Sequence, residues 1–327
     1  MNTIEVSHLR KFYSVFKKEP GVWGSLKSVF KRRYEEVRAV DDISFNIKEG
    51  ELVGFIGPNG AGKTTTLKCL SGLLYPDSGF VSVLGFQPWQ RKPEFQKQFA
   101  LVMGQKNQLW WDLPPMETFL LNKEIYEVPD EQFKKTLEEL VELLEVEDIL
   151  KIQTRKLSLG QRMKCELIAA LIHSPKVLFL DEPTIGLDVI MQKKIRDFIK
   201  EYNQRYQATI ILTSHYMGDV KELCQRVLII DKGQLVFDGA LEKIVKKYAE
   251  HKLISVVLSE KVSLEKLKQI GKVDKYDYPK VNFRIGKKQT SEITSKILEE
   301  LPIVDLNIEE SPIEEIIRDL FTKKNYR

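Results

Sequence analysis

Short apolar runs alternate with amphipathic segments over most of the chain. We predict strands at ISFNI (43–47) and LVGFI (52–56), and at two runs typical of strands buried on both faces, VLFL (177–180) and TIILT (209–213). Apolar positions at helical spacing predict an amphipathic helix over 133–150, and residues 189–206 also look helical. This alternation predicts a mostly parallel sheet with helices on both sides, closed by a hairpin near residue 239.

The pattern changes after a helical connection that begins at Leu241. Strands are predicted at 253–259, 273–278, 281–286 and 303–310, with helices at 263–271 and 290–301. A last helix has Ser311 as N-cap, Pro312 at its first position and Glu314 completing a capping box. We therefore expect a first domain over 1–245 and a small α+β domain over 246–327.

Composition is that of a soluble globular protein with room for two domains. The chain has 327 residues, of which 43% are hydrophobic and 30% charged. Its net charge of +4 is too small to indicate a nucleic-acid-binding protein. Its three cysteines form no C-x-x-C pair. No run approaches the length needed to cross a bilayer, so we expect another chain to span any membrane.

A glycine-rich loop follows the strand at 52–56 and opens a predicted helix. GPNGAGKT (57–64) satisfies G-x-x-x-x-G-K-[ST], the phosphate-binding loop, in the strand-to-helix context that this pattern requires. Its backbone N–H groups would surround an anion, Lys63 would reach the terminal phosphates, and the Thr64 hydroxyl would ligate magnesium. The predicted nucleotide-binding residues here are Gly57, Pro58, Asn59, Gly60, Ala61, Gly62, Lys63, Thr64 and Thr65.

Two carboxylates end the strand VLFL. Their position places them at the carboxyl edge of the sheet, beside the phosphate loop. We expect Asp181 to hold the magnesium ion, and Glu182 to orient or deprotonate the water that attacks the γ-phosphate. These parts alone specify only a P-loop nucleotidase.

Further segments narrow this class. Gln105 in GQKNQLWWDLP, LSLGQ (157–161), EPTIGLD (182–188) and TSH (213–215) occur in the order and spacing of an ATP-binding cassette. Over about residues 3–240 the sequence closely resembles the ATPase subunits of ABC transporters. The resemblance implies a RecA-like parallel core sheet with an antiparallel β subdomain and a helical subdomain. LSLGQ, QLWWDLP and DEPTIGLD are similar to the ABC-2-type exporter branch, whose members often carry a small C-terminal accessory domain.

The resemblance also assigns roles position by position. It implies that Gln105 contacts magnesium and water and couples the site to a membrane partner, and that His215 contacts the γ-phosphate and takes part in catalysis. Ser158, Gly160 and Gln161 would bind ATP across a dimer interface that Asp188 lines.

Leu159 departs from the family pattern, which has glycine there. A phosphate needs the Ser158 hydroxyl and the N–H groups at the start of the following helix, so a side chain at 159 can point away. We expect a negative φ at 159, because a left-handed backbone would cost leucine ~1 to 2 kcal/mol.

An aromatic ring usually stacks on adenine in these cassettes, and two positions compete. Tyr34 lies five residues before Ala39, the customary separation, whereas Phe12 and Tyr13 follow the first predicted strand. Sequence favours Tyr34, which makes residues 14–33 an insertion. Its apolar stripe and flanking basic residues suit an anionic membrane surface, a helix of the partner, or an edge of the domain itself.

The expected function is an energising subunit that binds ATP and Mg²⁺ and hydrolyses ATP. Its expected partners are a separate transmembrane permease and a second ATPase subunit, without nucleic acid, on the cytoplasmic side of the membrane. The alternative is a soluble cassette protein acting on ribosomes or DNA. The single cassette and the lack of sustained heptads between the phosphate loop and the carboxylates argue against it.

Overall fold

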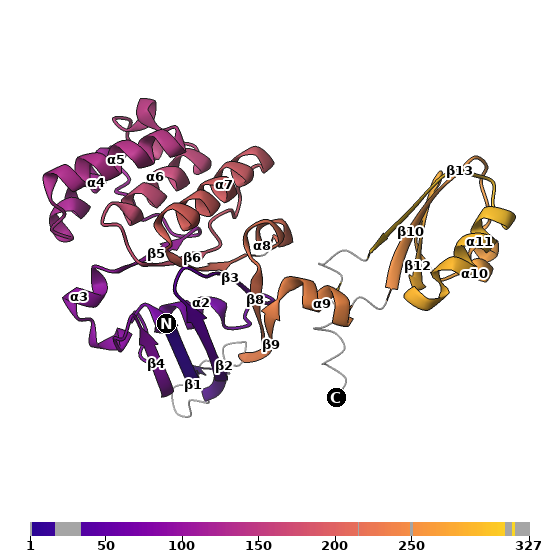
Figure 1. The fold of residues 1–327 in the computed structure, drawn as a ribbon, viewed down its shortest axis with the longest axis horizontal. Coiled ribbons are helices and arrows are strands. Elements are labelled where there is room, and N and C mark those ends of the chain that lie inside the picture. Colours follow the sequence, from indigo (N-terminus) through magenta and orange to yellow (C-terminus); the bar gives the residue numbers. More distant parts are fainter. Residues whose placement is uncertain (1, 17–33, 215, 249–250, 311–315, 318–327) are drawn as a thin grey trace, which may run out of the picture. The chain divides into compact units, whose positions relative to one another are not determined.

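A computed structural model describes the chain except for residues 1, 17–33, 215, 249–250, 311–315 and 318–327. It divides into two compact units, Met1–Gly239 and Ala240–Arg327 (Figure 1). Within the described residues, no helix combines the length and the hydrophobicity that crossing a membrane requires.

A six-stranded sheet forms the centre of the first unit. Its order is β5 (Phe99–Met103), β6 (Val177–Asp181), β7 (Thr209–Thr213), β3 (Leu52–Ile56), β8 (Arg226–Asp231) and β9 (Gln234–Ala240). The strands from β5 to β8 pair in parallel, which brings the carboxyl ends of β3 and β6 to one edge. The predicted parallel sheet, its buried strands and its closing hairpin are confirmed.

A second, antiparallel sheet has the order β2 (Tyr34–Lys48), β1 (Asn2–Phe16) and β4 (Ser78–Val83). β1 and β2 pair along their whole length, out to Phe16 opposite Tyr34. Phe12 and Tyr13 therefore lie within β1 rather than after it, and residues 14–16 of the expected insertion continue the strand. The apolar stripe of that insertion lies outside the described residues.

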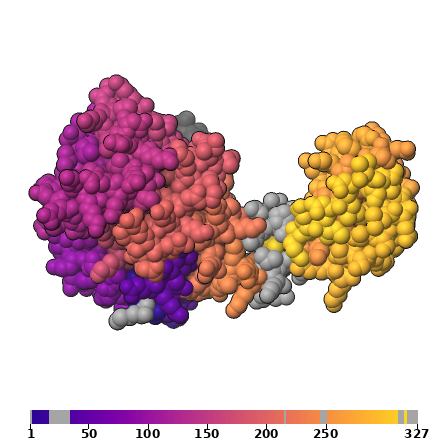
Figure 2. Space-filling view, turned by 45° about the horizontal axis from the view of Figure 1, so that its top comes forward, coloured from indigo at the N-terminus to yellow at the C-terminus, as the bar shows by residue number. Residues whose placement is uncertain are grey.

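Helices cover both sides of the central sheet. They are α2 (Lys63–Leu70), α3 (Pro93–Gln96), α4 (Pro115–Ile125), α5 (Asp130–Leu144), α6 (Leu159–Leu171), α7 (Val189–Tyr206) and α8 (Met217–Leu223). Figure 1 shows α4 to α7 on one side, with the antiparallel sheet and α2 on the other. In Figure 2 the magenta surface of the α4–α6 region and the indigo surface of β1 and β2 mark opposite ends of this unit.

The helix predicted over 133–150 both begins and ends earlier in the structure. α5 begins at Asp130, where two acidic residues in its first turn suit the positive end of the helix dipole. It ends at Leu144 because Glu145 adopts a left-handed conformation, with φ of 51°. A single 3₁₀ turn, Glu147–Ile149, follows.

The second unit begins with α9 (Leu241–Tyr248) and continues as a small α+β layer structure. Its elements are β10 (His251–Leu258), α10 (Leu264–Ile270), β11 (Val273–Asp277), β12 (Lys280–Gly286), α11 (Thr290–Glu300) and β13 (Ile303–Glu310). They form an antiparallel sheet of order β11-β12-β10-β13, with α10 and α11 against one face (Figure 1). A core of its own, which includes Phe283, Leu267 and Ile297, lies between sheet and helices. The start of the predicted last helix, Ser311 to Glu314, lies outside the described residues.

Candidate active site

The phosphate loop joins the end of β3 to the start of α2, and two of its glycines are required by close backbone approaches. A Cβ at Gly57 would lie 2.3 Å from the Ile230 carbonyl oxygen, and one at Gly62 would lie 2.2 Å from that of Ala39. Gly62 also has a φ of 107° and gives α2 no side-chain cap. The first N–H groups of α2 therefore point into the loop, where an anion can accept from them.

Lys63 lies inside this loop and is only 5% exposed. Its ammonium donates to the carbonyl oxygens of Gly57, at 2.7 Å, and Pro58, at 3.0 Å. Burial lowers the pKa of Lys63, while the negative charges of Glu182 and Asp181 act against that shift. A buried ammonium that donates to neutral carbonyl oxygens is a favourable place for negatively charged phosphate oxygens.

Asp181 connects the loop to the neighbouring strands. Its carboxylate accepts from the Thr64 hydroxyl at 2.8 Å and from the Thr213 hydroxyl at 2.6 Å. A hydroxyl and a carboxylate are the oxygen ligands that Mg²⁺ prefers, and Mg²⁺ usually keeps several waters and phosphate oxygens besides. Since one hydroxyl and one carboxylate leave the other positions around the ion to phosphate oxygens and water, this donor set fits magnesium held together with a nucleotide.

Glu182 occupies a strained position next to Asp181. Its φ is 56°, in the left-handed region, and its carboxylate accepts from the Gln105 amide at 2.8 Å. A Cβ at Gly104 would lie 2.1 Å from the Glu182 carbonyl oxygen, so only glycine fits beside it. Backbone strain of this kind concentrates at functional sites, and here it sets the direction of the Glu182 side chain.

Asp219 was not predicted as a site residue, yet its fully buried carboxylate connects several segments around the site. It accepts from the hydroxyls of Thr184, at 2.5 Å, and Ser214, at 2.6 Å, and pairs with Arg196 at 2.9 Å. Thr184 follows Glu182 by two residues and Ser214 precedes His215, which itself lies outside the described residues. A TSH segment followed by an acid on the next helix is the only sequence signal that could have found Asp219.

The LSLGQ segment begins α6, and Ser158 is its N-cap. The Ser158 hydroxyl accepts from the Gln161 N–H at 3.2 Å, and the Gln161 side chain accepts from the Ser158 N–H at 2.9 Å. Leu159 is the first helical residue and is not among the described residues with positive φ, so the prediction of negative φ is confirmed. Ser158 is exposed.

Asp188 lies close to the same segment. Its side chain caps α7 by accepting from the Met191 N–H at 2.9 Å. A Cβ at Gly160 would lie 2.7 Å from Met191 Cγ, so Gly160 gives α6 room to approach the start of α7. The fold thus brings the predicted residues Ser158, Gly160 and Asp188 to one region of the surface.

The two candidate adenine contacts lie at different distances from the phosphate loop. The Ala39 carbonyl borders Gly62, and Phe12 and Tyr13 pair with Arg38 and Val37, the residues immediately before Ala39. Tyr34 lies five residues from Ala39 in an extended strand, which separates the two by about 16 Å. Tyr34 is 57% exposed beside Phe16, so nearness to the loop now favours Phe12 or Tyr13.

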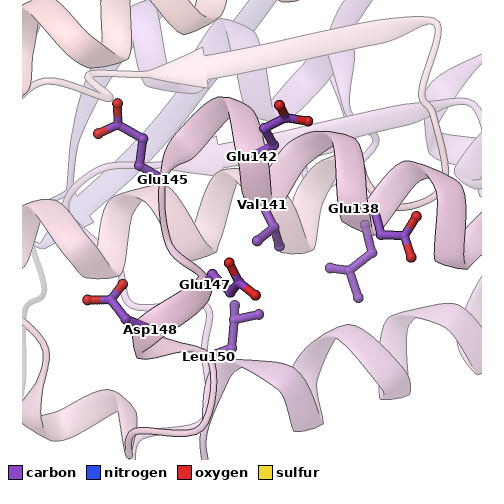
Figure 3. A pocket seen from close by; sticks show the side chains of 8 residues that line it. Glu138, Val141, Glu142, Glu145, Glu147, Asp148 and Leu150 are labelled. Atoms are coloured by element: carbon purple, nitrogen blue, oxygen red, sulfur yellow. The ribbon is translucent and has the colours of Figure 1, made fainter.

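A large pocket elsewhere does not suit a nucleotide. Its volume is about 930 Å³, and its lining joins α5 to the turn that follows: Leu137, Glu138, Val141, Glu142, Glu145, Glu147, Asp148 and Leu150 (Figure 3). The labelled carboxylates surround an apolar floor, and a triphosphate would be repelled by them.

Two protein-family models match the chain. The family described as "ABC transporter" matches residues 40–185, and the one described as "EvrA-like ABC transporter, C-terminal domain" matches residues 250–309.

Curated relatives match about two thirds of this chain and most of their own length. The ABC transporter ATP-binding protein NatA of Bacillus subtilis is 32% identical over 71% of this chain and 94% of the relative. The bacitracin transport ATP-binding protein BcrA of Bacillus licheniformis is 33% identical, over 68% and 72%. The Nod factor export ATP-binding protein I of Burkholderia pseudomallei is 32% identical, over 66% and 70%.

Solved structures share the fold at lower identity. The structure of the ATP-binding subunit of an ABC transporter has a TM-score of 0.62 at 23% identity, covering 82% of this chain and 98% of the other. A dimeric cassette in a post-hydrolysis state, bound to ADP and Pi, has a TM-score of 0.60 at 22% identity and covers 72% and 98%.

Proposed function

Because this chain belongs to the ABC transporter family as an ATP-hydrolysing subunit, we propose that it energises an ABC-2-type exporter whose membrane-spanning part is a separate permease. A relative named for Nod factor export supports this direction of transport. The chain would then act at the cytoplasmic face of the membrane. In this proposal residues 1–245 are the cassette, and 246–327 form an accessory domain.

The phosphate loop and the carboxylates beside it would carry the chemistry. Lys63 would exchange its carbonyl partners for the terminal phosphates, and Thr64, Asp181 and Gln105 would hold Mg²⁺, which neutralises phosphate charge when bound. Glu182 would orient the attacking water. His215 keeps its proposed role at the γ-phosphate, and either Phe12 or Tyr13 would stack on adenine.

A second cassette would complete the site. Ser158, Gly160 and Gln161 begin a helix whose first N–H groups favour an anion, and Asp188 lies in the same region. We infer that two subunits close over ATP so that this surface of one faces the phosphate loop of the other. The dimeric relative bound to ADP and Pi supports such pairing.

One contact carries the proposal. The 2.8 Å hydrogen bond from Thr64 to Asp181 joins residues 117 positions apart, and it puts the hydroxyl of the phosphate loop on the carboxylate that ends β6. An ordinary strand-to-helix turn, or a strand end facing solvent, would not require the Thr64 hydroxyl to contact the Asp181 carboxylate.

The test is a Glu182→Gln variant purified from membranes with Mg²⁺ and ATP. It should bind ATP, hydrolyse it at least about a hundredfold more slowly than the wild type, and hold a membrane-spanning protein with it. Lys63→Ala is the matched control, because loss of the phosphate contact should prevent ATP from stabilising that complex. Recovery of ribosomes or DNA in place of a membrane protein would overturn the proposal.

A further inference from the structure

A single buried carboxylate joins three segments of the first unit. Asp219, in the first turn of α8, is fully buried, and Thr184 and Ser214, whose hydroxyls it binds, are each 1% exposed. Its Oδ2 accepts from the Thr184 hydroxyl at 2.5 Å and from the Ser214 hydroxyl at 2.6 Å. Its Oδ1 accepts from the Arg196 guanidinium of α7 at 2.9 Å.

Thr184 connects this carboxylate to the segment of Glu182. The Ile185 N–H donates to the Glu182 carbonyl at 3.2 Å, so Thr184 is the third residue of a turn that begins at Glu182. The Leu187 N–H donates to the Thr184 carbonyl at 3.3 Å, so a second turn begins at Thr184 and ends one residue before Asp188. Fixing the Thr184 side chain therefore fixes the point where these two turns meet.

Ser214 connects the same carboxylate to the segment that follows β7. Its hydroxyl donates to Asp219 and accepts from the Tyr216 N–H at 2.9 Å. The Asp219 N–H in turn donates to the Tyr216 carbonyl at 3.1 Å. The residues on both sides of position 215 are therefore fastened to Asp219.

Arg196 supplies the opposite charge that a buried carboxylate requires. Its guanidinium also pairs with Glu222 of α8 at 2.7 Å, and the Glu222 side chain is 31% exposed. Contacts with Arg196 alone would anchor α8 to α7. The two short hydroxyl contacts on the other oxygen of Asp219 go beyond what that anchoring needs.

We propose that Asp219 is a positioning residue for ATP hydrolysis, which holds the segments of Glu182 and His215 in one fixed relation through the hydroxyls of Thr184 and Ser214. This inference rests on the proposed roles of Glu182 and His215 at the γ-phosphate. Glu182 must direct a water at the phosphate that the other segment contacts, so a shift between the two segments misaligns the reacting groups. A misplacement of about 1 Å can cost about a hundredfold in rate.

ATP affinity should not depend on Asp219. Lys63 and Thr64 are fixed by hydrogen bonds within the phosphate loop and to the end of β6. The hydrogen bonds that Thr184 and Ser214 make within the described residues do not reach that loop. Loss of the Asp219 carboxylate should therefore lower kcat and leave the dissociation constant for ATP unchanged.

Asp219→Asn in the purified full-length chain tests this expectation. Asparagine keeps the size of the side chain, but its amide nitrogen cannot accept from a hydroxyl or a guanidinium. At saturating ATP, kcat should fall by about tenfold or more. The dissociation constant for ATP, from calorimetric titration with Mg²⁺ chelated, should stay within about twofold of the wild type. Rates are compared where the rate per subunit no longer rises with protein concentration, so weaker pairing of subunits does not enter.

Glu222→Gln is the matched control. Glu222 lies on the same helix as Asp219 and shares Arg196 with it, but its printed contacts are with Arg196 and Lys193 rather than with either hydroxyl. This variant should leave kcat unchanged even where thermal unfolding shows a lower Tm. Equal losses of kcat in the two variants would mean that Asp219 only anchors α8, and would overturn the proposal.

Thr184→Val removes one hydroxyl at nearly unchanged volume and leaves Asp219 paired with Arg196 and Ser214, so it tests the proposal even if Asp219→Asn does not fold. Its kcat should fall by about threefold or more, and Thr184→Ser, which keeps a hydroxyl, should stay within about twofold of the wild type. Adding Thr184→Val to Asp219→Asn should cost less than about twofold further, because the carboxylate through which the hydroxyl acts is already absent.

Three further results would overturn the proposal: wild-type kcat in Asp219→Asn or Thr184→Val, weaker ATP binding at unchanged kcat, or fully additive losses in the double variant. These assays use the purified chain without a permease, so a failure of the export proposal leaves them interpretable. Hydrolysis by Glu182→Gln at the wild-type rate would instead refute the proposed role of Glu182, which none of the Asp219 comparisons does.

Discussion

The Gln105 amide donates a 2.8 Å hydrogen bond to the carboxylate of Glu182, across 77 positions of sequence. The residue expected to ligate magnesium thus holds the residue expected to direct the water. Nucleotide and metal must draw Gln105 away from Glu182, or share it, before both roles can operate.

Replacing Gln105 separates these roles. Gln105→Ala should lower ATP hydrolysis by about ten- to a hundredfold, because it removes both a metal ligand and the donor that positions Glu182. ATP binding measured without Mg²⁺ should not change. Gln105→Glu keeps an oxygen ligand but places two carboxylates together, so it should restore Mg²⁺-dependent binding without restoring hydrolysis. Wild-type hydrolysis by the alanine variant would contradict this reading.

Leu159 and Gly160 should differ sharply in their tolerance of substitution. Leu159→Gly should change ATP turnover little and cost about 1 kcal/mol of stability, since it puts glycine into the first turn of α6. Gly160→Asp should abolish turnover, because it brings a carboxylate to the proposed phosphate-binding end of that helix. Gly160→Ala is the steric control, as its Cβ meets only the flexible side chain of Met191. Steady-state ATPase assays decide; equal losses at 159 and 160 would refute the account.

The adenine contact can be assigned with single alanine variants. Phe12→Ala or Tyr13→Ala should weaken ATP binding by about tenfold through loss of stacking, whereas Tyr34→Ala should leave it unchanged. Calorimetric titration in the Glu182→Gln background avoids turnover during the measurement. If Tyr34→Ala alone weakens binding, the distance argument along β2 is wrong.

Glu166 should make stability depend on pH. Burial raises the pKa of this α6 carboxyl to about 7, against the lowering effects of the Gln108 N–H and Arg162. Because the folded pKa lies above the unfolded one, stability should fall as pH rises from about 4.5 to about 7 and then level off, by up to about 3 kcal/mol. Glu166→Gln should remove that fall and unfold less readily at pH 8 than the wild type does.

Denaturant titrations at pH 5, 6, 7 and 8 measure this effect. Glu142→Gln, which changes an exposed carboxylate on α5, is the control and should leave the pH profile of the wild type intact. A Glu166→Gln profile parallel to that of the wild type would show that the carboxyl is not protonated in the folded chain.

The parts of the site that lie within a single segment could be predicted from the local sequence. The phosphate loop follows from glycine spacing between a strand and a helix, and the positions of Asp181 and Glu182 follow from their place after a buried run. The negative φ of Leu159 followed from the needs of a helix start.

Contacts between distant segments could not be read in the same way. Asp219 binds Thr184, Ser214 and Arg196, and no spacing rule joins those residues. Glu166 has an ordinary sequence context for an acid on a solvated helix face, yet α6 is packed so that it is 2% exposed. The preference for Tyr34 assumed a customary separation from Ala39, and the extended pairing of β1 with β2 leaves that ring far from the loop.

The reciprocal hydrogen bonds of Ser158 and Gln161 bear on how a transport cycle resets. In the proposed cycle, two cassettes separate and Ser158 loses its contact with ATP. The Ser158 hydroxyl then still accepts from the Gln161 N–H within its own subunit. In the lone subunit the Ser158 and Gln161 N–H groups therefore both have an internal partner, and a phosphate that accepts from the Gln161 N–H would have to displace the Ser158 hydroxyl. Because the phosphate competes with this internal hydrogen bond, its net binding free energy is smaller. We therefore expect the phosphate to be released readily after ATP is cleaved.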